Sequence, residues 1–327
     1  MILKTLKSNR ASQFLLVSLF IAGFWMRSIL HPGVYPFFEG EDKMPLYQLF
    51  SMIPGNRALV GCVLSIVFVI FISFMILRLN TVHGLISART FLPSTIFVFI
   101  AGGFVTLHTM HPVYAGILFF ILCIDRVFKA YEERKLLSCA FDAGFFLGTG
   151  SLFYFCLVFY FPVIIIGLFL IHKRIEWRSF FLSLIGVLLP WLFLFSLYFM
   201  TDRQAELWPV IVQNVATPNP FFRATIYFQV YLLFLTLIML VSSLFLLSEY
   251  GTQKINIRKY FKVFLLIFLF SVVILFSVPA VSQEILLILA VPLTFLISNY
   301  LILIRKQFWG NLILYIFLGA VIVLQFV

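Results

Sequence analysis

Charged residues are scarce in this sequence: they make up 11% of its 327 residues, whereas hydrophobic residues make up 63%. A soluble domain is typically about 45–50% apolar, so the composition excludes a soluble fold of this length. Runs of about 20 apolar residues, the length that a helix needs to cross a bilayer core, recur from end to end. We therefore predict an all-α, polytopic integral membrane protein that forms a single transmembrane domain over residues 1–327.

Three further absences from the sequence narrow the class of membrane protein. The roughly ten-residue alternating segments of a transmembrane β-barrel are missing. No small-x-small cleavage site follows the first apolar run, which favours a retained first helix over a signal peptide. None of the four cysteines forms a C-x-x-C pair, so a redox or metal role has little support and we interpret them as small apolar packing residues.

Eleven apolar segments are candidate helices. Their ranges are 12–30, 58–77, 91–107, 113–124, 139–157, 162–172, 180–200, 224–247, 263–277, 285–304 and 311–327. Two of them, 113–124 and 162–172, are too short to span a bilayer alone. Residues 139–172 are either one bent helix or two helices broken near Pro162. The sequence thus predicts nine to eleven transmembrane helices.

The basic residues predict an orientation, because cytoplasmic loops hold the excess of lysine and arginine. With the N-terminus inside and eleven crossings, 18 of the 23 basic residues fall in inner segments and 5 in outer ones. The net charge of +11 therefore reflects membrane topology, not nucleic-acid binding. This places the C-terminus, an acidic loop at 31–57 and a large loop at 201–223 outside.

The acidic loop carries three carboxylates within four residues, Glu39, Glu41 and Asp42. One reading is a catalytic base or a site for a divalent cation, since carboxylates serve both roles, and the other is a solvated turn. The following stretch MPLYQLFSMIPGN, residues 44–56, has the pattern of a short helix lying in the membrane interface. No metal ligand set is recognisable, and no cofactor is certain.

This order of first helix, acidic outer loop and interfacial helix resembles the glycosyltransferase C superfamily of polytopic membrane proteins. A second stretch, ERKLLSCAFDAGFFLGTGSLFYFCLVFYFPVIIIGLFLI at 133–171, is similar to a segment that recurs there. The resemblance covers about residues 10–200, within an uncharacterised family of bacterial membrane proteins. It implies a transferase at the outer face of the bacterial cytoplasmic membrane that uses a polyprenyl-phosphate-linked sugar, with a carboxylate of the first loop as base.

The chain departs from that superfamily in three ways. Three carboxylates compete for the catalytic position, a soluble outer domain is missing, and the break SLFYFCLVFYFP lacks the common lysine. The sugar, the acceptor, any protein partner and the essential carboxylate therefore stay open.

Basic side chains predicted on the outer side are candidate substrate-binding residues. Guanidinium groups suit phosphate, which favours Arg57 and Arg223, with Arg203 a further candidate; headgroup snorkelling is the alternative. His108 and His111 are also candidate substrate-binding residues. They share a helical face if the helix persists, but two histidines alone are a weak metal site, and the alternative is that they are polar residues ending a helix at the interface.

Two other functions fit the sequence. A transporter or lipid flippase needs ionisable groups inside spanning helices, and here the helix interiors are poor in them. A non-enzymatic membrane subunit or scaffold is compatible with the small outer loops and with the 43 phenylalanines.

Overall fold

The computed structural model describes residues 3, 6–7, 12–37, 40–88, 90–131, 136–172, 177–218, 226–248, 253–304 and 307–326. The first half of the chain forms α2 (Ser12–Leu30), α3 (Gln48–Ser51), α4 (Arg57–His83), α5 (Leu92–Gly102), η1 (Val105–Leu107), α6 (Pro112–Lys129) and α7 (Leu136–Ser151). The second half forms η3 (Phe155–Tyr160), α8 (Phe161–His172), α9 (Trp177–Met200), α10 (Gln204–Ala216), α11 (Ile226–Ser248), α12 (Ile255–Ser277), α13 (Ile285–Leu303) and α14 (Gln307–Phe326).

In the described part of the chain, eight helices are long and apolar enough to cross a membrane. Each of the eleven predicted segments coincides with a helix or with a short helix pair, so the all-helical membrane architecture is confirmed. The eight candidate spans among the described residues are fewer than the nine to eleven predicted, because several of the predicted segments are too short to count as spans. Leu92–Gly102 is a shorter apolar helix. All of its residues are buried, so neighbouring helices, and not lipid, surround α5.

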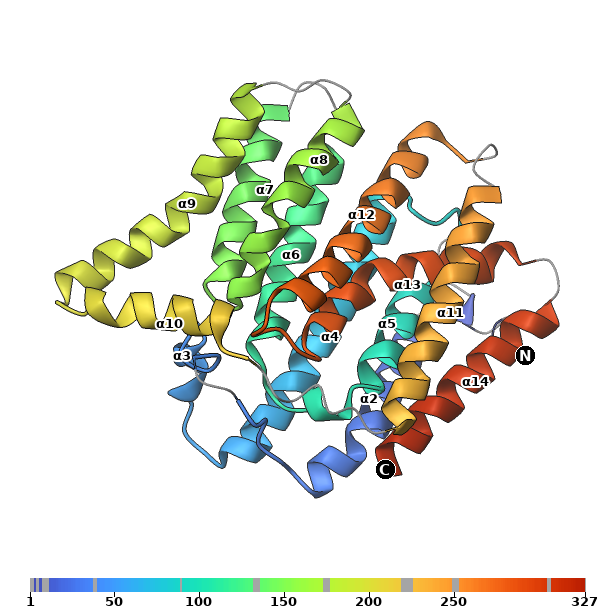
Figure 1. Ribbon diagram of the computed structural model, residues 1–327. Coiled ribbons are helices and arrows are strands. Elements are labelled where there is room, and N and C mark those ends of the chain that lie inside the picture. Colours follow the sequence, from blue (N-terminus) through green and yellow to red (C-terminus); the bar gives the residue numbers. More distant parts are fainter. Residues whose placement is uncertain are drawn as a thin grey trace.

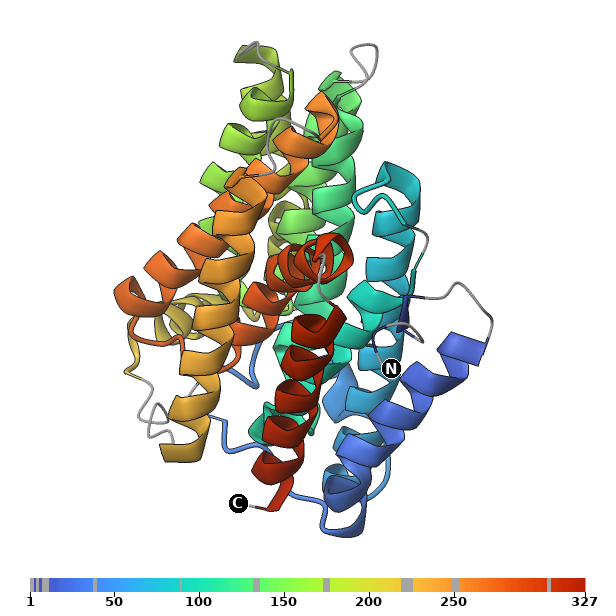
Figure 2. The same ribbon diagram turned by 90° about the vertical axis from the view of Figure 1, so that its right-hand side faces the viewer.

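The helices pack around α13, which is apolar on every side. Within its span 89% of the residues are buried, as expected of a helix that has no polar face. It contacts α5, α6, α11 and α12. The last helix, α14, lies on the outside of this group together with α2 (Figures 1 and 2).

The break predicted near Pro162 lies earlier in the chain, at residues 152–154. Helix α7 ends at Ser151, and the chain resumes in η3 at Phe155. Pro162 is the second residue of α8, where the N–H that proline lacks has no partner within the helix. The structure therefore favours two elements over one bent helix.

The predicted large loop at 201–223 contains a helix that the sequence interpretation missed. In Figure 1, helix α10 runs from the lower end of α9 back toward the rest of the bundle. Leu207 and Asn214 are buried, while Trp208 is 70% exposed. This amphipathic pattern is typical of a helix in the membrane interface. By contrast, the interfacial helix predicted over 44–56 is only the four-residue α3.

Pairs of acidic and basic side chains gather where α4 and α6 end and α7 begins. His83 Nε2 lies 2.9 Å from Asp125 Oδ1, and Lys129 Nζ lies 2.7 Å from Asp125 Oδ2. Arg126 pairs with Asp142 at 3.2 Å. These pairs belong to the segments predicted to be inner and basic, so those segments share one end of the bundle.

Helices α7 and α9 approach each other through small residues. A Cβ at Gly148 would lie 2.4 Å from the carbonyl oxygen of Val187, and one at Gly144 would lie 2.1 Å from that of Ser183. Glycines spaced four apart let two membrane helices make backbone contact. Any side chain at these positions separates the helices.

We therefore expect Gly148→Ala to lower the free energy of unfolding by about 1–3 kcal/mol, the usual cost of overpacking. The measurement is thermal unfolding of purified protein in detergent. Gly23→Ala in α2 is the matched control, because nothing lies within 4 Å of a Cβ there. Equal unfolding temperatures for the two variants would contradict this packing.

Candidate functional site

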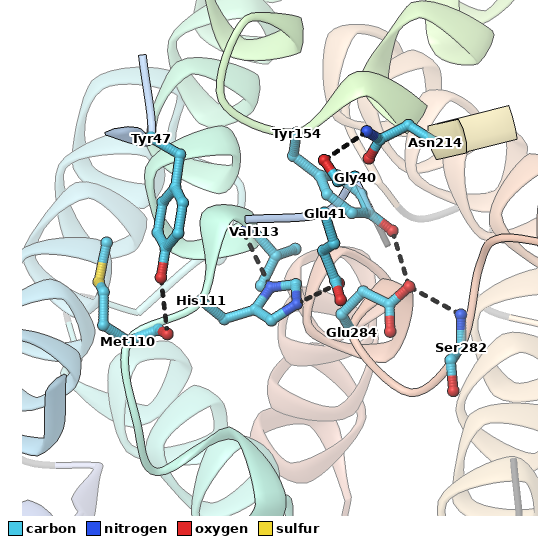
Figure 3. Close-up of polar contacts among 10 residues, drawn as sticks. All are labelled: Gly40, Glu41, Tyr47, Met110, His111, Val113, Tyr154, Asn214, Ser282 and Glu284. Carbon is cyan, nitrogen blue, oxygen red and sulfur yellow. Dashed lines mark hydrogen bonds and ion pairs between the residues drawn. The ribbon is translucent and has the colours of Figure 1, made fainter. Parts of the chain in front are cut away.

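Connections from four parts of the chain meet at the end of the bundle opposite the basic segments. They are the loop after α2, the segment before α6, helix α10 and the turn before α13 (Figure 3). The positive-residue count assigned all of them to the same side of the membrane. Their contacts show that they share one end.

The loop after α2 turns sharply at Gly40, where φ is +96°, a conformation that favours glycine. Asn214 of α10 donates a hydrogen bond from its side-chain amide to the Gly40 carbonyl oxygen, at 2.8 Å. This turn sends the next two side chains in different directions: Glu41 is 1% exposed, whereas Asp42 is exposed.

Glu41 meets His111 inside the protein. The Nε2 atom of His111 lies 2.5 Å from Oε1 of Glu41, and the His111 side chain is fully buried. The backbone N–H of Val113 donates to Nδ1 of the same ring at 3.1 Å, which makes His111 the N-cap of α6. Burial lowers the pKa of His111 to about 4, so the ring is neutral, and its one proton sits on Nε2 and is donated to Glu41.

A second carboxylate, Glu284, joins this pair. Glu284 is fully buried immediately before α13. Its Oε1 accepts hydrogen bonds from the Ser282 backbone N–H at 2.7 Å and from the Tyr154 hydroxyl at 3.2 Å. Burial, and then the charge of Glu41, raise the pKa of Glu284 to about 7. One ligand atom from each of Glu41, His111 and Glu284 lies within 4.8 Å of the others.

A pocket of about 420 Å³ lies beside this cluster. Its charged lining residues are Asp42, Lys43 and Arg57. The Tyr35 and Phe37 rings line the pocket and also contact the ring of His111, with centroids 4.7 and 5.8 Å away. These two rings therefore form the wall between the pocket and the buried cluster.

The predicted site residues separate into three groups. Glu41 and His111 are in the buried cluster, and Asp42 and Arg57 line the pocket. Arg203 is exposed and pairs with Glu206 at 2.7 Å, away from the pocket lining. Glu39 and Arg223 lie outside the described residues.

The condition under which His108 and His111 would share a helical face is not met, because no helix continues from one to the other. The 3-10 helix η1 ends at Leu107, and α6 begins only at Pro112. His108 instead stacks on Trp25, with ring centroids 4.0 Å apart, and contacts Ser28. Burial lowers its pKa to about 3, so His108 is a neutral packing residue here.

The sequence interpretation missed Glu284, Tyr154 and Asn214. A signal for Glu284 was present: it is a lone carboxylate directly before a long apolar helix, in a segment predicted to lie outside. Ionisable residues at the border of a spanning segment are candidate functional residues. No local pattern indicates that Glu284 faces Glu41.

Comparison with known proteins gives a family but no activity. A family model described as a family of unknown function (DUF6427) matches residues 46–327. This range includes His111 and Glu284 and begins after Glu41. No curated protein and no solved structure matches the chain.

The packing of the Gly40 turn against α10 can be tested by substitution. A Cβ at this position would lie 2.6 Å from the Gln213 Cβ, and φ is positive. We expect Gly40→Ala to push the loop away from α10 and to lower the free energy of unfolding by about 1–3 kcal/mol.

Gly33→Ala is the matched control in the same loop, because nothing lies within 4 Å of a Cβ there. Thermal unfolding in detergent measures both variants. An unfolding temperature for Gly40→Ala equal to that of Gly33→Ala would rule out the packing of this loop against α10.

Proposed function

The chain belongs to DUF6427, a family of unknown function, and we propose that it is a membrane-embedded transferase that acts on a phosphate-linked lipid. In keeping with the glycosyltransferase C resemblance, the donor is a polyprenyl-phosphate-linked sugar. The end of the bundle that carries Glu41 then faces the outer side of a bacterial cytoplasmic membrane, with the N-terminus inside and the C-terminus outside. One observation carries the proposal: a pocket beside the buried Glu41–His111 pair combines a carboxylate, two cations and apolar side chains.

The cations suit the phosphate of such a donor. Arg57 and Lys43 both line the pocket and both are exposed. Arg57 is also the first residue of the 27-residue α4, so the positive end of the helix dipole reinforces its charge. Guanidinium binds phosphate oxygens in a bidentate manner, which makes Arg57 the main phosphate ligand in this proposal.

The apolar part of the pocket suits the lipid chain. Phe50, Ile53 and Leu64 line it. Further along α4, Val63 and Val67 are 56% and 54% exposed, as expected for side chains that face lipid. A polyprenyl chain can therefore lie along α4 while its phosphate reaches Arg57.

Asp42 is the carboxylate that is placed to act on an acceptor. It lines the pocket, whereas Glu41 lies behind Tyr35 and Phe37. In the proposed step, Asp42 accepts the proton of the acceptor hydroxyl as that oxygen bonds to the anomeric carbon of the sugar. The bond from this carbon to the phosphate oxygen breaks at the same time, and polyprenyl phosphate leaves with the electron pair. Glu41 and His111 hold the wall of the pocket in place.

The lipid that stays bound to the purified protein tests this proposal. We expect native mass spectrometry of the purified full chain to find a polyprenyl-phosphate species bound to the wild type and absent from Arg57→Ala, because the substitution removes the phosphate ligand. Arg203→Ala is the matched control, since Arg203 is exposed and pairs with Glu206 outside the pocket. It should retain the lipid.

Bulk phospholipid alone on the wild type, unchanged by Arg57→Ala, would refute the transferase proposal. That result would favour the alternative of a membrane scaffold. Loss of the lipid from Arg203→Ala as well would show that retention depends on general surface charge and not on this pocket.

A further inference from the structure

The carboxylates of Glu41 and Glu284 are buried together at the end of the bundle opposite the basic segments. Glu41 is 1% exposed and Glu284 is 0% exposed, and Figure 3 shows their carboxyl groups side by side. Burying a single carboxylate costs several kcal/mol unless a cation or hydrogen bonds compensate for it. Two adjacent carboxylates repel each other in addition, so this arrangement requires a partner with positive charge or a shared proton.

The described contacts of Glu284 compensate for only part of its charge. Oε1 of Glu284 accepts two hydrogen bonds, but its Oε2 is buried and has no hydrogen-bond partner among the described residues. No lysine or arginine in the described part of the chain pairs with Glu284. A buried, unsatisfied carboxylate oxygen beside a second carboxylate is a ready ligand for a cation.

His111 is not free to act as a direct ligand. Its Nδ1 accepts the Val113 N–H, and its Nε2 proton points to Glu41. A neutral imidazole used in this way has no lone pair left for a metal ion. Its hydrogen bond instead fixes the orientation of the Glu41 carboxylate, as outer partners of metal ligands commonly do.

We propose that Glu41 and Glu284 together bind one hard divalent cation of the Mg²⁺ or Mn²⁺ class, with His111 as the residue that positions Glu41. Carboxylate oxygens are the ligands that such ions prefer. Two carboxylates and one divalent ion have no net charge, which removes most of the cost of burying the pair.

The ion links segments that are distant in the sequence. It joins the loop after α2, through Glu41, to the turn before α13, behind the Tyr35 and Phe37 wall of the pocket. A role for the ion in ordering a substrate pocket rests on the proposed function. The binding of the ion itself does not.

Titration of Mn²⁺ into the full-length, chelator-stripped protein in detergent tests the site. The readout is the electron paramagnetic resonance signal of free Mn²⁺, which falls as the ion binds. We expect one Mn²⁺ per chain. Glu41→Gln and Glu284→Gln should each weaken binding at least about tenfold, and His111→Gln, by losing the orienting hydrogen bond, about 10- to 100-fold.

Asp42→Asn is the matched control: it removes the same charge from the residue next to Glu41, but that side chain faces the pocket. It should leave the affinity within about twofold, since a single exposed charge contributes little. Pulsed measurements on the bound ion should show no directly bonded nitrogen.

Wild-type protein that binds no stoichiometric Mn²⁺ would overturn the proposal whether or not the variants fold. So would equal weakening by Asp42→Asn and Glu284→Gln, or a nitrogen ligand on the ion. Failure of lipid retention with Mn²⁺ binding intact would contradict the transferase proposal and leave the cation site standing.

Discussion

The hydrogen bond between His111 and Glu41 is the contact on which the functional end of this protein depends. It joins the loop after α2 to the start of α6, two segments 70 residues apart, inside a region without access to water. A buried carboxylate is tolerated only where its charge is compensated, so this contact limits where the loop can lie. The positions of Tyr35, Phe37 and Asp42, and hence the shape of the neighbouring pocket, follow from it.

The two ends of the bundle use their charged residues differently. At one end Asp125 and Asp142 pair with basic partners on α4 and α6, which is local neutralisation at helix termini. At the other end, the carboxylates of Glu41 and Glu284 lie close to each other and to the neutral ring of His111. These two buried carboxylates adjoin the pocket that carries the exposed side chains of Lys43 and Arg57.

The helices were largely predictable because membrane helices are specified by long apolar runs that need no partner to be recognised. The first predicted helix, 12–30, has the same bounds as α2. Short segments were less reliable: α6 extends from Pro112 to Lys129, beyond its apolar core. Helix α10 was read as a loop because it is amphipathic, although Leu207, Val210, Ile211 and Asn214 carry the helical spacing.

The site was predictable only in part. Three carboxylates within four residues of an outer loop indicated the region, and the turn at Gly40 decides that Glu41 faces inward and Asp42 outward. A single sequence cannot show this, since the turn is held by Asn214, 174 residues further along. The proximity of Glu41 to Glu284 has the same origin, because it depends on how elements that are distant in the sequence, such as α6 and α13, pack together.

A double-mutant cycle on Glu41 and His111 tests most directly whether this contact organises the site. The free energies of unfolding are compared for the wild type, Glu41→Ala, His111→Ala and the double variant. A direct buried contact predicts that the two substitutions are non-additive by about 1–3 kcal/mol. Additivity to within about 0.5 kcal/mol would show that the two side chains do not interact, and would contradict the account.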